Sequence, residues 1–318
     1  MELTVVMSVY NGEAHLYEAV ESISNQTFKN FRFLIVNNGS TDGTAEILQK
    51  YQLIDDRIEI ITNPKTLTYV EGRTLAINKV NTEWMALMDA DDISEPTRLE
   101  KQVKLIEEHG ENLGAIGTWA KYINAKGEKL GNMVMEPTSE QKFQKLYREN
   151  EAIVLIDPSS VIHRPTFNLV GGYREVCVPA ADLDLWYRIA EQGKTLLILP
   201  EYLFRYRVHG GSDSVKKTLL QRKKTHFINY NMRLRRSGDN EITWDEYLKD
   251  VWSKPFYKYP KLRIDWSMTL YKRAGLLYGE ERFFHCVLNL TKAALLNPRF
   301  VIKRLLSQKL LAKTFDGS

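Results

Sequence analysis

The stretch WMALMDADDISEP, residues 84–96, places an apolar run directly before a cluster of carboxylates. The apolar part, 84–88, is typical of a strand in the core of a sheet, because it is short, continuous and bounded by polar residues. Asp89, Asp91 and Asp92 follow it at once. Carboxylates this close raise one another's pKa unless a positive charge neutralises them. A divalent cation with oxygen ligands would do so; the alternative is a solvated turn that caps the next helix.

Segments of strand and helix character alternate upstream of these acids. The expected strands are 3–10, 31–36, 57–62 and 83–88, and the expected helices are 12–26, 44–51 and 71–80. This alternation predicts an α/β fold with a mostly parallel sheet flanked by helices. Ligands of such sheets bind beyond the carboxyl ends of the strands. Because the acids, the turn 37–40 and the segment 8–12 all follow strand ends, we expect them to converge on one site.

The region from 111 to 213 is less regular. We expect a strand and hairpin over 114–131, a helix over 139–151, a strand over 152–164, a helix from Asp182 to Gly193, and strands over 195–200 and 202–210. From residue 214 the periodicity is helical, over 215–236, 271–279, 281–296 and 298–313. We therefore divide the chain into a first domain, 1–213, and a helical C-terminal region, 214–318.

The composition is that of an ordinary globular protein, with 43% hydrophobic and 26% charged residues among 318, and not that of a disordered chain. No apolar run reaches the roughly 18 residues that a membrane-spanning helix needs. The N-terminus leads into a strand without the basic leader of a signal peptide. Cys177 and Cys286 lie far apart without metal-site spacing. We expect a cytoplasmic protein with free thiols.

Charge is unevenly distributed along the chain. Residues 1–213 carry 22 Lys and Arg against 31 Asp and Glu, a net charge of −9, and residues 214–318 carry 22 against 9, a net charge of +13. A basic half of this kind suits an anionic surface, nucleic acid or lipid, unless it is only a solvated helical face. Residues 297–313 place apolar and basic residues at helical spacing, which is typical of helices that lie in a membrane interface. The alternative is that this apolar face docks on the catalytic domain and that the charges are solvated.

Six segments, taken in order, resemble the family 2 glycosyltransferases of the GT-A fold. They are SVYNGEAHLYEAVESISNQTFKNFRFLIVNNGSTDGT, MDADDISEPTRLEKQV, GAIGTWAKYIN, GGYRE, ADLDLWYRIAEQG and YRVHGGSDS, within about residues 1–215. The resemblance implies a GT-A catalytic domain at 1–213, followed by the basic helical extension. It implies inverting, metal-dependent transfer of a sugar from a nucleoside-diphosphate sugar to an acceptor hydroxyl. The implied setting is bacterial cell-surface polysaccharide or lipid-linked glycan synthesis, with peripheral membrane contact through the C-terminal helices and no nucleic-acid partner.

The same resemblance assigns the acids to a metal centre for Mn²⁺ or Mg²⁺. Asp91 is implied as the direct metal ligand, and Asp89 as a contact to the ribose or to a metal-bound water, with Ala90 between them in the donor site. His209 is implied as the residue that completes the metal shell. The ion would stabilise the charge on the departing diphosphate. We expect Asp92 to cap the next helix or to orient its neighbours.

The nucleotide end of the site is implied to include Val9 and Tyr10, which line the base. Asn37 and Asn38 stand where the family has two aspartates, one of which accepts a hydrogen bond from the imide N–H of uracil. An amide oxygen still accepts that bond, although the amide also brings a donor. The preference for uracil is therefore open, since thymine has the same imide, and the implied donor is a UDP- or dTDP-sugar. Arg73 is a candidate contact for the phosphates.

Asp182 lies where the family has its catalytic base, in a segment that has Ala181 in place of the family's Glu. An inverting transfer needs one carboxylate to take the proton of the acceptor hydroxyl. The alternative is that Asp182 only caps the helix that it begins. Gly171, Gly172 and Trp186 are implied on the acceptor side, where a glycan or lipid-linked acceptor would bind.

Three other functions fit parts of the sequence. DADDIS resembles the motif of haloacid-type phosphatases, in which the first Asp is a nucleophile. That motif normally follows the first strand of its domain, whereas DADDIS follows the fourth expected strand, and Ile93 stands at its Thr position. A nucleotidyltransferase would need a Gly-rich phosphate loop with a lysine after the first strand, which SVYNGEAH lacks. A nucleotide-sugar-binding protein of the same fold with weak or no activity is the alternative that stays open, because the paired asparagines and Ala181 depart from the family pattern.

Overall fold

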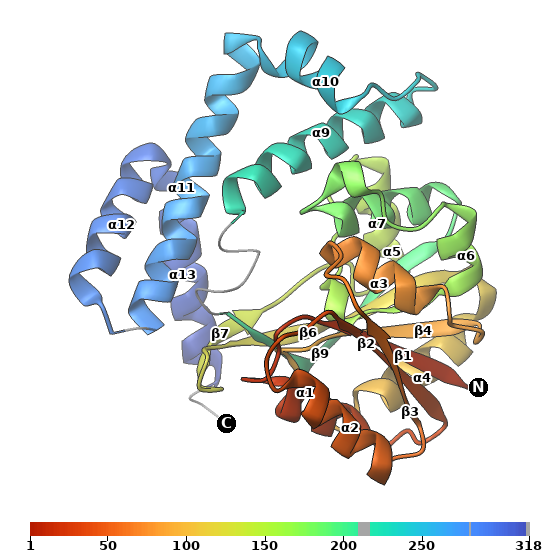
Figure 1. The fold of residues 1–318 in the computed structure, drawn as a ribbon. Helices are drawn as coiled ribbons and strands as arrows, with labels where there is room; N and C mark the ends of the chain where they lie inside the picture. The colour runs from red at the N-terminus through yellow and green to blue at the C-terminus, as the bar shows by residue number, and fades with distance from the viewer. Residues whose placement is uncertain (209–216, 280, 316–318) are drawn as a thin grey trace. The chain divides into compact units, whose positions relative to one another are not determined.

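The computed structural model describes residues 1–208, 217–279 and 281–315, and of residues 307–315 it describes the backbone. The chain divides into two compact units (Figure 1). One consists of residues 1–123 and 132–207, and the other of residues 124–131 and 208–318. The boundary that we expected between residues 213 and 214 lies outside the described residues.

A sheet of nine strands, counted over the described residues, forms the centre of the first unit. Its order is β3-β2-β1-β4-β8-β6-β9-β5, with β7 paired to β6. Strands β1 to β4 are parallel, as are β6 and β9, whereas β8 is antiparallel to β4 and β6, and β5 to β9. The strands are β1 Leu3–Val9, β2 Phe31–Asn38, β3 Ile58–Asn63, β4 Trp84–Asp89, β5 Ile93–Ser94, β6 Leu113–Ile123, β7 Lys129–Met133, β8 Val161–His163 and β9 Thr195–Arg207.

Helices cover both faces of this sheet (Figure 1). Apolar side chains of α1, α2 and α4 pack with the sheet in one hydrophobic cluster, and those of α3, α5, α6 and α7 pack with it in a second. The elements are α1 Leu16–Ser24, α2 Thr44–Ile54, α3 Tyr69–Ile77, α4 Arg98–His109, α5 Glu140–Arg148, α6 Arg164–Leu169 and α7 Ala181–Glu191, with the 3-10 turns η1 Gly110–Asn112, η2 Asp157–Ser159 and η3 Glu175–Cys177. The predicted α/β fold with a mostly parallel, helix-flanked sheet is confirmed.

Side-chain alternation along β4 directs the first acid. Every second residue from Trp84 to Met88 packs in the cluster of α1, α2 and α4, whereas Met85 and Leu87 pack in the cluster of α3 and α7. Successive side chains of a strand point to opposite faces. Asp89 is next in the second series, so it points to the face that carries α3 and α7.

The ends of β1 and β4 mark a reversal in strand order. The chain proceeds from β1 to β2 and β3 on one side of the sheet and places β4 on the other side of β1. Ser8 of β1 pairs with Asp89 of β4. Open parallel sheets bind ligands where the strand order reverses, beyond the carboxyl ends of the strands. The acids therefore lie at the place where this kind of sheet forms a binding site.

The structure corrects the prediction of a strand over 152–164. Only β8, Val161–His163, is a strand, and η2 lies before it. The apolar residues Ile153, Leu155 and Ile156 are buried without forming a strand. Burial alone therefore explains their apolar character, because a short buried run does not distinguish a strand from an irregular core segment.

The two strands expected over 195–200 and 202–210 are one strand, β9. Its pairing with β6 shifts from Thr118–Leu199 to Trp119–Tyr202, which skips Pro200. Proline has no N–H to donate to the ladder, and a bulge absorbs the unpaired residues without ending the strand.

The described part of the second unit, apart from residues 124–131, is built from helices. They are α9 Thr218–Arg236, α10 Trp244–Glu246, the π-helical η4 Tyr247–Trp252, α11 Pro255–Gly279, α12 Phe283–Leu296 and α13 Pro298–Phe315. The helix expected over 271–279 is the end of the longer α11. Tyr247 is fully buried among aromatic rings that include Trp244 and Trp252. None of the described helices combines the length and the apolar character that crossing a bilayer requires.

Candidate active site

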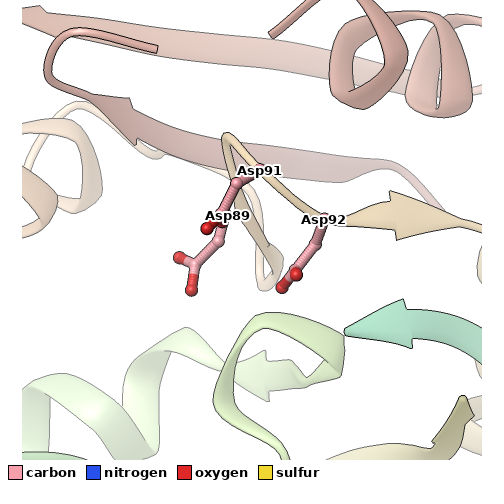
Figure 2. Close-up of side chains that lie close together, drawn as sticks. All are labelled: Asp89, Asp91 and Asp92. Carbon is pink, nitrogen blue, oxygen red and sulfur yellow. The ribbon is translucent and has the colours of Figure 1, made fainter. Parts of the chain in front are cut away.

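The three acids of the opening stretch lie at the end of β4 and on the turn that leads to β5 (Figure 2). Asp89, Asp91 and Asp92 each have a carboxylate oxygen within 4.8 Å of the others. Burial raises the pKa of Asp89 to about 6, with Asp91 and Asp157 adding to the rise and the Arg73 guanidinium opposing it. The turn therefore concentrates negative charge that a cation would stabilise.

Asp92 is buried. We expected it to cap the next helix or to orient its neighbours, and it does not cap α4. The N-cap of α4 is Thr97, which makes no side-chain capping bond. Asp92 instead accepts a hydrogen bond at Oδ1 from the backbone N–H of Arg207, at 2.7 Å. Burial raises the pKa of Asp92 well above its usual range, and Asp91 and Asp89 add to this. Its Oδ2 has no hydrogen-bond partner among the described residues.

Arg207, the last residue of β9, holds the acidic turn from the other side. Its Nε donates to the carbonyl oxygen of Asp91 at 2.6 Å, and its Nη2 is paired with the carboxylate of Glu18 on α1. The side chain is almost completely buried. Arg207 therefore fixes the backbone of the turn. His209, expected as a metal ligand, lies outside the described residues.

Arg73 of α3 lies between two carboxylates. Its Nη2 is paired with Asp89 and its Nη1 with Asp157, and its guanidinium carbon lies 4.5 Å from the ring centroid of Tyr69. The side chain is 1% exposed. Both Nη groups therefore bind protein carboxylates rather than facing an open phosphate site, and within the described part of the chain Nε has no partner.

Asp157 is a site residue that we did not identify from the sequence. The hydroxyl of Tyr173 donates to its Oδ1 at 2.8 Å, while Arg73 binds its Oδ2. Asp157 thus connects Arg73 to the segment that follows Gly172. One local signal was present, because Asp157 is the only charged residue in the apolar segment 152–162.

Asp182 lies in the first turn of α7, and the N-cap of this helix is Ala180. Asp182 is therefore not the N-cap residue of α7. Burial raises the pKa of Asp182 to about 7, and the negative charge of Asp157 contributes to the rise. A carboxylate with a pKa near neutrality suits a general base, because it can both lose and accept a proton at the working pH.

The next acid of α7 has a different environment. Asp184 is fully buried and accepts hydrogen bonds from Arg174 at 2.8 Å and from Arg188 at 2.9 Å. Although burial favours its neutral form, these two guanidinium groups hold the pKa of Asp184 below its usual range. Asp184 therefore remains charged and links α7 to Arg174. Its pKa is lowered, whereas that of Asp182 is raised.

The glycine pair before Tyr173 is fixed by α7. Gly171 and Gly172 have φ of +76° and +63°, a conformation that glycine adopts at little cost. A Cβ on Gly172 would lie 2.9 Å from the ring of Phe167. The carbonyl oxygen of Gly172 accepts a hydrogen bond from Arg188 at 2.6 Å. The loop is therefore held in one conformation.

Trp186 does not reach an acceptor. It is completely buried in the cluster of α3 and α7, which corrects our expectation. The side chain lies on the inward face of α7, where its large apolar area is removed from water.

The nucleotide end of the site lies at the ends of β1 and β2. Val9 is buried and Tyr10 is half exposed. The amide of Asn38 accepts from the backbone N–H of Leu67 at 3.0 Å and donates to the carbonyl oxygen of Leu67 at 3.1 Å. Asn37 accepts from the backbone N–H of Ser40 at 3.1 Å. An aspartate could not make the donor bond of Asn38, so this structure explains one asparagine of the pair.

The model of the Glycosyl transferase family 2 matches residues 4–169, slightly more than half of the chain. The chain belongs to family 2 of the glycosyltransferases. It is 26% identical over 309 residues to an uncharacterized glycosyltransferase of Methanocaldococcus jannaschii, covering 96% of this chain and 93% of that protein. It is 28% identical over 217 residues to the O-antigen biosynthesis glycosyltransferase WbnJ of Escherichia coli, covering 66% and 81%.

Solved structures of similar fold support the assignment of this glycosyltransferase to the GT-A fold. A mannosyltransferase of Pyrobaculum calidifontis, in complex with GDP-Man and Mn²⁺, is similar over 98% of this chain and 80% of that chain, with a TM-score of 0.55 and 14% identity. Residues 1–349 of TarS from S. aureus, in complex with UDP-GlcNAc, are similar over 92% and 91%, with a TM-score of 0.55 and 15% identity.

The residues on the acidic turn of this glycosyltransferase fit a divalent cation. The donor set consists of carboxylate oxygens, which Mg²⁺ and Mn²⁺ prefer. The Oδ2 atom of buried Asp92 has no partner in the described structure, and an unpaired buried carboxylate oxygen is costly unless a cation or a donor binds it. The family assignment also excludes the phosphatase and nucleotidyltransferase alternatives.

Proposed function

We propose that this glycosyltransferase transfers one sugar, with inversion, from a nucleoside-diphosphate sugar to an acceptor hydroxyl. The observation that carries the proposal is the acidic turn at the reversal of strand order, on the face of the sheet that also carries Asp182. An inverting transfer needs one base at the acceptor, and a cation at the leaving group would stabilise the charge that develops there. The catalytic domain would be 1–213, followed by the basic helical region 214–318.

Asp91 and Asp89 would hold Mn²⁺ or Mg²⁺ on the donor diphosphate, with His209 as a further ligand. When bound, the ion supplies stabilisation of the negative charge on the leaving diphosphate. Arg73 would act through Asp89, whose carboxylate it fixes. Arg207 would keep the backbone of Asp91 in place.

Val9, Tyr10, Asn37 and Asn38 would form the nucleotide pocket, with Ala90 as the small residue between the metal-binding aspartates. We propose a UDP- or dTDP-sugar as donor, because the uracil and thymine bases present the same imide N–H to an amide oxygen. The solved structures in complex with UDP-GlcNAc and with GDP-Man support a nucleoside-diphosphate sugar as the donor class.

Asp182 would take the proton of the acceptor hydroxyl as that oxygen attacks the anomeric carbon. The glycine loop would position the acceptor, since Gly171 and Gly172 bring backbone rather than side chain to that side of the site. The relative named for O-antigen biosynthesis supports a glycan or lipid-linked acceptor in cell-surface polysaccharide synthesis.

A donor screen tests the proposal. UDP-, dTDP- and GDP-sugars would be added with Mn²⁺, and the thermal midpoint measured for each. A true donor stabilises the fold by mass action, and the product formed from it should have the inverted anomeric configuration by NMR. A retained configuration would remove Asp182 from its proposed role. If none of these sugars raised the thermal midpoint, the proposed donor class would be wrong.

A further inference from the structure

Helix α12 has apolar side chains on its outward face as well as on its inward face. Inward, Cys286 is buried in a small core with Ala274 and Leu277 of α11. Outward, the exposed fractions are 76% for Phe284 and 80% for Leu295. A surface helix of a globular protein normally presents polar residues to water. The outward face of α12 is therefore an anomaly that a partner would explain.

The exposed residues form one stripe. Residues 284, 287, 288, 291 and 295 recur every three or four positions and therefore share one side of a helix. They are Phe284, Val287, Leu288, Thr291 and Leu295. Phe283, also exposed, packs edge-on against exposed Tyr278 of α11, with ring centroids 5.8 Å apart. Figure 1 shows α12 at the outer edge of the helices of this unit.

From residue 282 to residue 315, the charged residues of this part of the chain have one sign. Between Arg282 and Asp316 the sequence has no Asp or Glu, and its charged residues are all basic: Lys292, Arg299, Lys303, Arg304, Lys309 and Lys313. An apolar stripe with Lys and Arg beside it is the composition of helices that lie in the interface of anionic membranes. A tyrosine at the edge suits the same interface, because its ring is apolar and its hydroxyl is polar.

Helix α13, which the sequence indicated for this role, uses part of its apolar face for packing. Val301 is buried, and the ring of Phe300 lies edge-on to Tyr271 of α11, with centroids 5.5 Å apart. Ile302, Leu305 and Leu306 are exposed, and the side chains beyond residue 306 lie outside the described ones. Phe300 therefore packs on α11, within the helices of its own unit.

We infer that the outward face of α12 is the surface by which this glycosyltransferase binds an anionic phospholipid bilayer. The four apolar residues of the stripe would enter the headgroup region, and the basic residues of α12 and α13 would contact lipid phosphates. A second copy of the chain fits less well, because a two-fold interface brings each patch against its own copy and would oppose the same basic residues. The inference rests on the proposed function only in its purpose, which is to bring the active site to a lipid-linked acceptor.

Vesicle flotation of the full chain tests this inference. Vesicles of phosphatidylcholine alone would be compared with vesicles containing about 30% phosphatidylglycerol, at low and high salt. We expect binding to the anionic vesicles that weakens with salt. The variant Phe284→Glu with Leu295→Glu should lose about tenfold or more of this binding, because two charges would enter the apolar interface.

Leu53→Glu is the matched control, since Leu53 lies on α2 of the first unit and is 85% exposed; it should bind vesicles like the parent chain. Equal binding by the double variant, or equal binding to neutral and anionic vesicles, would overturn the inference. Dimerisation of the parent chain that the double variant abolishes would assign the face to a second copy instead. A separate donor assay without vesicles distinguishes these outcomes from failure of the proposed transfer, because neither variant touches the active site.

Discussion

Arg73 forms a buried ion pair with Asp157, a residue 84 positions later in the chain. The same guanidinium is paired with Asp89. One buried cation therefore joins the acidic turn to η2, and through Tyr173 to the glycine loop. The donor and acceptor sides of the proposed site are thus parts of a single charge network. A change at Asp157 should therefore affect both sides.

Asp157→Asn should destabilise the fold and alter catalysis. Arg73 would lose one of its two charged partners, and breaking a buried pair costs roughly 3–5 kcal/mol. Because the charge of Asp157 contributes to the raised pKa of Asp182, the pH midpoint of activity should move to lower pH. Urea unfolding and a pH–rate profile measure the two effects. An unchanged midpoint in a folded variant would separate Asp157 from the base.

Asp91→Ala should abolish metal-dependent donor binding and transfer. The ion would lose its direct ligand, and the other proposed carboxylate ligand, Asp89, is shared with Arg73. Calorimetric titration with a donor and Mn²⁺ measures the loss. Asp92→Ala is the comparison and should be less severe. Turnover by Asp91→Ala at the parent rate in the presence of a chelator would show that the turn holds no catalytic metal.

Asp182→Asn should leave donor affinity intact and lower transfer by roughly 10²–10⁴-fold, the range for a general base. The carboxylate form is the active one, so the rate of the parent enzyme should rise with pH and level off above the pKa of about 7. The variant should lack this rise. A parent profile that falls with increasing pH across neutrality would contradict the assignment.

The same substitution should not weaken the fold at alkaline pH. A folded-state pKa above the unfolded value means that the charged form of Asp182 is disfavoured in the fold, so its contribution to stability declines as pH rises toward the folded pKa. Asparagine removes that charge. The thermal midpoint of Asp182→Asn at pH values above 7 should equal or exceed that of the parent, whereas a clear decrease would make Asp182 a structural residue.

Asn38→Asp should destabilise the protein although it restores a residue that the family commonly has. A carboxylate cannot donate to the part-buried carbonyl oxygen of Leu67, and leaving such an acceptor unpaired costs up to about 1–3 kcal/mol. Asn37→Asp is the matched control, because its bond from Ser40 needs only an acceptor. Chemical unfolding of both variants tests this, and equal stability would show that the Asn38 amide is not required.

Gly172→Ala should be more harmful than Gly171→Ala. Both positions have positive φ, which costs alanine about 1 kcal/mol. A Cβ at Gly172 would in addition meet the ring of Phe167, while at Gly171 nothing lies within 4 Å in the described structure. The thermal midpoints should therefore fall in that order. The KM for the acceptor should rise more in Gly172→Ala, and an equal effect of both changes would mean that the ring moves aside.

Much of the fold was predictable because its causes are local in the sequence. The apolar run before Asp89 indicates a buried strand, and the alternation of strands and helices indicates a parallel sheet. A parallel sheet brings strand ends to one edge, so Tyr10, Asn38 and Asp91 could be placed together without a structure. The β9 bulge at Pro200 and the absence of a strand over 152–160 were not predictable in this way. Both depend on which neighbouring strand, if any, each residue pairs with.

The sequence by itself determined which residues carry charge at the strand ends, and the tertiary structure decided what each charge binds. Asp92 lies beside Asp91 in the chain, yet its partner is the backbone of Arg207, 115 positions away. Trp186 follows the proposed base closely, yet it points into the core. Hydrophobic periodicity predicts local structure from neighbours along the chain. The partner of a charged group depends instead on which opposite charges lie close to it in the folded structure and on how buried they are. For that reason Asp157, an isolated acid in an apolar segment, is identified as a site residue only when Arg73 and Tyr173 lie against it.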